Sequence, residues 1–164
     1  IDSYKEAIRL NSRYADAHMA LGQAAITRHQ YSKARESFDA YRTARTEDAT
    51  VFYEIGKSWD LQTQDDNALA SSRTAVKQLP NHAASWVGIG DILSRKGKSK
   101  DAERAFAKGV AADEEFMPGV CQLGVLRSRT KLNGATRQRL EKCAKSEDSP
   151  EDMKTAAMEV LEDI

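Results

Sequence analysis

Cysteine, proline and long apolar runs are all scarce in this sequence. The 164 residues include two cysteines and three prolines, and two cysteines are too few for a disulfide framework. No stretch approaches the roughly 18 consecutive apolar residues of a membrane span, so we expect no insertion into a membrane. The first residues are not a signal peptide. Because the chain opens at Ile1 within a helical pattern, we interpret it as a piece of a longer protein, and we expect a cytoplasmic location.

The sequence also carries no net excess of positive or negative charge. Lysine and arginine number 25, as do aspartate and glutamate, and a neutral balance argues against general binding to nucleic acid or to a membrane surface. Locally, residues 117–148 hold seven basic and three acidic residues, whereas residues 149–164 hold five acids and one lysine. Two interpretations stay open: the two segments neutralise one another, or the basic segment binds an acidic partner or nucleic acid.

Residue patterns that carry chemistry are missing as well. The sequence has no phosphate-binding glycine loop and no Ser/His/Asp set that can be placed on one surface. The three histidines fall at unrelated positions, and Cys121 and Cys143 lie 22 residues apart, which is not the spacing of a zinc site. We therefore expect no catalytic residues, no metal and no cofactor, with Cys143 as a small buried residue of the core.

What the sequence does contain is a glycine at every 34th residue from 22 to 124. The four are Gly22, Gly56, Gly90 and Gly124. Each follows an apolar residue, and twelve places after each stands a small residue: Ala34, Ala68, Ala102 and Thr136. Glycine inside a helix costs about 1 kcal/mol relative to alanine and is tolerated where a neighbouring helix must come close. We therefore expect each glycine to face the small residue on the next helix.

This pattern resembles the tetratricopeptide repeat, a helix–turn–helix unit of 34 residues. In the unit that starts at Ala83, the residues that carry the resemblance are Trp86, Gly90, Ala102 and Phe106. On this register the chain comprises the second helix of a truncated repeat (1–14), four repeats (15–48, 49–82, 83–116 and 117–148) and a C-terminal capping helix (149–164) with Ser149 as its expected cap. No single repeat can bury its own apolar face, so we expect one continuous array.

The resemblance implies a fold and a function. The fold is all-α, an α-solenoid of antiparallel helix pairs wound into a right-handed superhelix. Members of the family are scaffolds and adaptors, seldom enzymes, and their first helices line a concave groove that holds a partner's peptide or helix. At the fifth and ninth places of the four repeats, the expected groove residues are Met19, Gln23, Tyr53, Lys57, Val87, Asp91, Cys121 and Val125.

The fifth-place residues are expected to form one apolar column along this groove. Members that hold the acidic tails of heat-shock chaperones use lysine, asparagine and arginine at particular groove places. Those places are occupied here by Met19, Gln23, Glu54, Ala84 and Gly88, so we do not expect a chaperone tail as the ligand.

The sequence thus predicts a non-catalytic interaction module whose partner is a protein or peptide. Two alternatives stay open. The piece could be an architectural spacer, or could associate with itself through the open half-repeat at residues 1–14. It could also be an enzyme with an unrecognised site, which no residue pattern favours.

Overall fold

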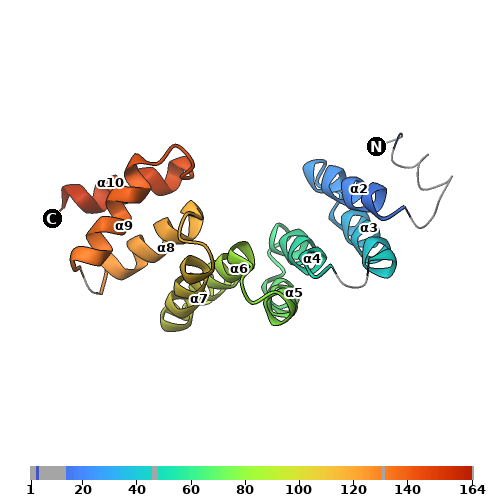
Figure 1. Ribbon diagram of the computed structural model, residues 1–164, viewed down its shortest axis with the longest axis horizontal. Helices are drawn as coiled ribbons and strands as arrows, with labels where there is room; N and C mark the ends of the chain where they lie inside the picture. Colours follow the sequence, from blue (N-terminus) through green and yellow to red (C-terminus); the bar gives the residue numbers. More distant parts are fainter. Residues whose placement is uncertain (1–2, 4–13, 46–47, 131, 164) are drawn as a thin grey trace. The chain divides into compact units, whose positions relative to one another are not determined.

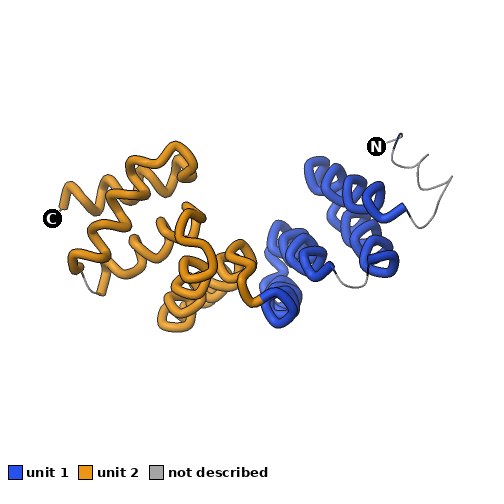
Figure 2. Tube along the Cα trace, in the orientation of Figure 1, with its two compact units in different colours: residues 1–79 blue, residues 80–164 orange. Residues whose placement is uncertain are grey.

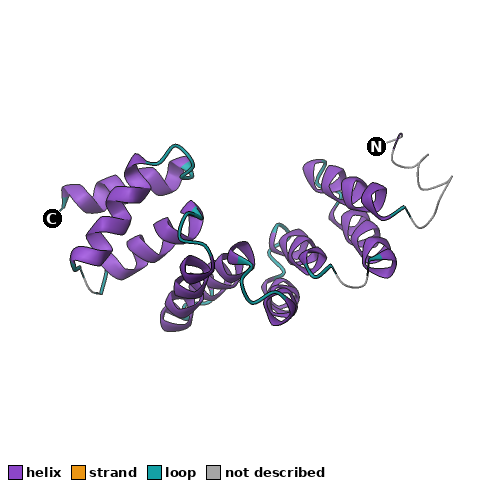
Figure 3. Cartoon of the chain, in the orientation of Figure 1, coloured by secondary structure: helices purple, strands orange, loops and turns teal. Residues whose placement is uncertain are grey.

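The computed structural model describes residues 3, 14–45, 48–130 and 132–163 (Figure 1). These residues form nine α-helices and no strand (Figure 3). The helices are α2 (Ala15–Thr27), α3 (Tyr31–Ala44), α4 (Thr50–Asp60), α5 (Asp65–Gln78), α6 (Ala83–Arg95), α7 (Ser99–Ala112), α8 (Met117–Ser128), α9 (Gly134–Lys145) and α10 (Glu151–Glu162). The predicted all-α class is confirmed. The truncated repeat expected at residues 1–14 lies outside the described residues, except for Ser3 and Tyr14.

Consecutive helices pack as pairs, α2 with α3, α4 with α5, α6 with α7, and α8 with α9. In the first three pairs the connecting turn has the same backbone geometry. The second-last residue before the second helix has a positive φ, which is 57° at His29, 56° at Thr63 and 71° at Gly97. The next N–H bonds to the carbonyl five residues earlier, as from Lys98 to Leu93 at 2.9 Å. This is the Schellman ending of a helix.

The chain divides into two compact units, residues 1–79 and 80–164 (Figure 2). The described helices of the first unit are α2 to α5, and those of the second are α6 to α10. In the first unit, one buried cluster comprises Ala15, Ala25, Ala34, Phe38, Tyr41 and Val51. In the second, the largest side chains with almost no exposure are Ile92, Phe106, Leu123 and Leu140.

Two of the repeated glycines lie under an aromatic ring. A Cβ atom added at Gly22 would lie 2.3 Å from the Phe38 ring, and one added at Gly90 would lie 2.4 Å from the Phe106 ring. In the first and third repeats, the atoms nearest to the glycine therefore belong to the phenylalanine four places beyond the alanine, a contact that the sequence analysis did not predict. Such distances are far below van der Waals contact, so these positions accept no side chain without movement.

The second repeat has no phenylalanine at that place, and its glycine makes a different contact. Ser72 stands there and is 4% exposed. A Cβ atom at Gly56 would lie 2.9 Å from the Ser72 hydroxyl oxygen and 3.3 Å from the backbone oxygen of Ala68. Here the backbone of the second helix does come close to the glycine, as expected from the sequence.

The last helix, α10, packs against both α8 and α9. Its side chains Met153, Val160 and Leu161 surround a cluster formed by Leu140, Ala157 and the two cysteines. The expectation that Ser149 caps this helix is wrong, because Pro150 occupies the N-cap position and makes no side-chain cap bond. Ser149 is instead 5% exposed and points into the cluster.

Candidate interaction site

In the first unit, the expected binding residues lie on two neighbouring helices. Met19 and Gln23 belong to α2, and Tyr53 and Lys57 belong to α4. Residues four apart share one face of a helix, and α2 contacts α4. Gln23 and Lys57 are exposed, whereas Met19 and Tyr53 are half-buried. The unit therefore offers a half-buried apolar residue beside an exposed polar one on each of the two helices.

In the second unit, two of the four expected residues are interior. Val87 on α6 is 6% exposed and Cys121 on α8 is 0% exposed. The expectation that these two side chains form an open apolar column is wrong, because neither can contact a partner in this conformation. Asp91 and Val125, one turn further along the same helices, are half-buried. Val125 also packs against the cluster around the cysteines.

The fifth place of a repeat is buried because it faces the twenty-seventh place on the second helix. In the third repeat, a Cβ atom at Gly109 would lie 3.1 Å from Cγ2 of Val87. In the first repeat, Met19 packs against the cluster that contains Tyr41. Both pairs are 22 residues apart. Much of the surface of the fifth-place side chain is therefore buried against the second helix of its own pair.

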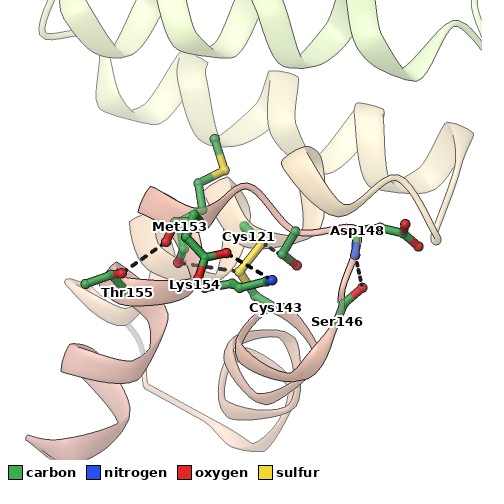
Figure 4. The surroundings of a disulfide bond; sticks show 9 residues. Cys121, Cys143, Ser146, Asp148, Met153, Lys154 and Thr155 are labelled. Atoms are coloured by element: carbon green, nitrogen blue, oxygen red, sulfur yellow. Dashed lines mark hydrogen bonds and ion pairs between the residues drawn. A yellow bond between two sulfur atoms is a disulfide. The ribbon is translucent and has the colours of Figure 1, made fainter.

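The fourth repeat makes the same contact covalently. Cys121 and Cys143, also 22 residues apart, form a disulfide between α8 and α9 with a Cα–Cα distance of 5.2 Å (Figure 4). The Ser149 hydroxyl donates to Cys121 Sγ at 3.5 Å, and Cys143 Sγ lies 3.6 Å from the Met153 carbonyl oxygen. The expected burial of Cys143 is confirmed at 0% exposure. The sequence analysis did not predict this bond. Its two cysteines have the same 22-residue separation as Val87 and Gly109 of the third repeat.

A short polar network joins the first and second repeats at residue 48. The Asp48 carboxylate accepts hydrogen bonds from the Tyr41 hydroxyl, from the Thr50 N–H at 3.0 Å and from the Thr50 hydroxyl at 2.6 Å. The bond to Asp48, followed by burial, raises the pKa of Tyr41 to about 12. Burial alone would raise the pKa of Asp48, but the bonds from Thr50 and Tyr41 outweigh it and hold that pKa below its ordinary value. The network is structural, since it fixes the start of α4.

The basic fourth repeat finds its acidic partners outside α10. Arg127 pairs with Glu103 of α7 at 2.7 Å, and Lys142 pairs with Glu115 at 2.8 Å. In the part of the chain that the structure describes, no ion pair joins residues 117–145 to the acids of α10. Neutralisation of the two segments by one another therefore involves no direct ion pair among the described residues and stays an interpretation.

The described residues hold neither a candidate metal site nor a candidate membrane span. No group of three or more histidine, cysteine, aspartate or glutamate side chains lies close enough to hold a metal ion. Among the described helices, none is both long enough and apolar enough to cross a membrane.

Comparisons with known proteins agree with the helix-pair architecture. A family model described as tetratricopeptide repeat matches residues 1–49. A crystal structure of MamA has a TM-score of 0.68 at 16% sequence identity, covering 98% of this chain and 85% of that one. The crystal structure of YrrB, described as a tetratricopeptide repeat protein with an unusual peptide-binding site, has a TM-score of 0.64 at 22% identity, covering 98% of this chain and 79% of that one.

A curated relative also matches along the sequence. The general transcriptional corepressor trfA of Dictyostelium discoideum is 28% identical over 116 residues, which is 70% of this chain. The chain spans only 8% of that relative's length. The chain is thus similar to the tetratricopeptide repeat family over residues 1–49, in agreement with the glycine interval. Its described residues fold as an all-α solenoid of helix pairs, as the solved neighbours do.

Proposed function

We propose that this chain is a non-catalytic scaffold or adaptor module that holds a peptide or helix of a partner protein on the first helices of its pairs. The observation that carries the proposal is the surface of α2 and α4. Half-buried Met19 and Tyr53 lie there beside exposed Gln23 and Lys57. Partly desolvated aromatic residues are frequent binding hot spots, and peptide helices dock through apolar anchors flanked by polar contacts.

In the second unit, the proposed contacts are fewer. Asp91 and Val125 are the expected residues that keep some exposure, while Val87 and Cys121 support them from the interior. Asp91 would set the direction of a bound segment by its charge. We infer that Tyr53 is the main anchor, because it is the aromatic residue at the fifth place and keeps some exposure.

The relatives support a protein partner. The YrrB structure is described by its peptide-binding site, and trfA is a corepressor. Because the chain spans 8% of trfA, the partner and pathway of that protein are not transferred to this one. Tetratricopeptide repeat proteins are typically non-catalytic, which favours a binding role. A cytoplasmic location is part of the proposal, with the Cys121–Cys143 disulfide as the observation against it, since such bonds persist mainly in oxidising compartments.

The test uses the partner captured from the native source by the full chain. Tyr53→Ala combined with Lys57→Ala is expected to weaken its binding at least about tenfold, or about 1.4 kcal/mol, measured by titration calorimetry with melting curves to verify the fold. Lys77→Ala, an exposed lysine on the second helix α5, is the control and should bind as the parent does. Undiminished affinity of the double variant would contradict the proposed surface.

Self-association is a separate possibility that the same material tests. Removal of residues 1–14 should lower the oligomeric state of the chain if the half-repeat joins two copies, as measured by light scattering. Partner binding through α2 and α4 would then be unchanged.

A further inference from the structure

A pocket of about 210 Å³ lies within the second unit, between the C-terminal part of α7 and the helices α8 and α9. Val110 and Val120 give it an apolar lining, and Val120 is 2% exposed. Small-molecule and cofactor sites usually measure about 300–1,000 Å³. This pocket is smaller, so its size suits one or two side chains of a partner protein.

One face of α9 forms the polar side of the pocket. Its lining residues are Ala135, Gln138, Arg139 and Lys142, spaced by three or four residues as on a single helix face. Lys142 is already engaged, because its ammonium group binds the Glu115 carboxylate at 2.8 Å and the Glu114 carbonyl oxygen at 2.9 Å. These two bonds tie α9 to the loop after α7.

Arg139 is the charge that the pocket offers to a ligand. Within the described residues its guanidinium has no carboxylate partner, and it donates only to the Ala135 carbonyl oxygen at 3.2 Å. Arg137, two residues earlier, is by contrast paired with Glu141 at 3.2 Å. Glu114 is the acidic residue of the lining, but it is exposed, where water and salt screen its charge.

We propose that this pocket binds an acidic segment of a partner protein. An apolar side chain of the segment packs chiefly on half-buried Val110, because Val120 is only 2% exposed. A neighbouring carboxylate pairs with Arg139, whose planar fork suits two parallel hydrogen bonds to a carboxylate. A protein segment fits better than nucleic acid, because the valine lining offers nothing to a phosphate or a sugar. The site is separate from the proposed surface on α2 and α4, since it belongs to the second unit and involves the second helices α7 and α9.

The test follows the amide NMR spectrum of the full chain during titration with a terminally blocked peptide in which leucine is flanked by glutamates. We expect saturable shifts at Val110, Val120 and Gln138. The same peptide with glutamines in place of glutamates should bind at least about tenfold more weakly.

Two variants on α9 provide the matched comparison. Arg139→Ala should weaken the binding of the glutamate peptide at least about tenfold, with the melting curve of the parent, because its one hydrogen bond is exposed. Arg137→Ala, on the same helix but outside the lining, should bind like the parent. Equal binding of both peptides, an unaffected Arg139→Ala variant, or shifts that avoid the pocket would each overturn the proposal. So would a single-stranded oligothymidine that shifts the pocket residues while the peptide does not.

Discussion

Residues 29, 63 and 97 share a left-handed backbone conformation, although only the last is glycine. The positive φ values recur at the 34-residue interval, because each turn ends the first helix of its repeat in the same way. An L-residue in this conformation costs about 1–2 kcal/mol, and a β-branched residue such as Thr63 is especially poorly suited to it. The first two repeats therefore carry local strain that the third avoids.

Relief of this strain is testable at Thr63. We expect Thr63→Gly to raise the free energy of unfolding by about 0.5–1 kcal/mol. The relief of the left-handed backbone strain exceeds the cost of the greater conformational entropy that glycine has in the unfolded chain. Urea denaturation measures the change. Thr74→Gly, within helix α5, is the control and should destabilise by about 0.3–0.5 kcal/mol. A lower denaturation midpoint for Thr63→Gly would show that the turn does not need this conformation.

The titration of Tyr41 gives a second prediction for a single residue. Its pKa is about 12, above the value of about 10 for an exposed tyrosine. A raised pKa means that its stabilising contribution is complete below pH 10 and is lost as the pH rises through 12. The opposite holds for Asp48, whose lowered pKa gives a contribution that is lost as the pH falls through its folded-state value.

The five tyrosines of the chain allow a direct measurement. The phenolate absorbance of the parent at about pH 11 should lack the Tyr41 contribution, since this pH lies between the two values. Tyr41→Phe should therefore leave the absorbance at this pH nearly unchanged and should remove the part of the titration that occurs near pH 12. A clear reduction of the absorbance at about pH 11 in Tyr41→Phe would mean that the bond to Asp48 is absent in solution.

At the scale of the helix, close packing depends on which glycine faces a neighbour. Gly88 and Gly90 are two residues apart on α6. A Cβ atom at Gly88 would have nothing within 4 Å, whereas one at Gly90 would meet the Phe106 ring. Phe106 is itself 1% exposed, so its ring has little room to move. The two glycines therefore have opposite roles. Gly90 permits the close contact between α6 and α7, whereas Gly88 only lowers the stability of the helix.

The two alanine variants should accordingly change stability in opposite directions. Gly90→Ala is expected to destabilise by about 1–3 kcal/mol through overpacking. Gly88→Ala is expected to stabilise by about 0.5–1 kcal/mol through helix propensity. Thermal unfolding of both variants measures the difference. If both substitutions shift the melting temperature in the same direction, the packing of Phe106 over Gly90 is not as described.

At the scale of the whole molecule, the 34-residue interval was enough to predict the class of fold, because glycines, the apolar residues before them and the small residues twelve places after them repeat together. The interval could not show which second-helix residue each glycine meets. The nearest neighbour of Gly90 is the Phe106 ring, and that contact depends on the orientation of the ring. The repeat boundaries and the single cooperative array stay predictions, and the structure adds that contacts group the chain into two units.

The expected binding residues show the same limit. The position of a residue in the repeat predicts which face of the first helix it lies on. The exposure of its side chain depends also on which residue of the second helix lies opposite. Gly109 opposite Val87 lets the two helices close over the valine, and Cys143 opposite Cys121 closes over it with a covalent bond. Lys57 and Gln23, one turn further along, stay exposed.

The disulfide also determines how the chain would respond to mechanical force. A tetratricopeptide array pulled from its two ends unfolds by extending each repeat in turn. The bond between Cys121 and Cys143 carries tension directly from α8 to α9, so the intervening residues never bear load. The fully extended chain would therefore be shorter by about 75 Å. Residues 121–143 would remain a closed loop after the other helices had been unfolded and extended.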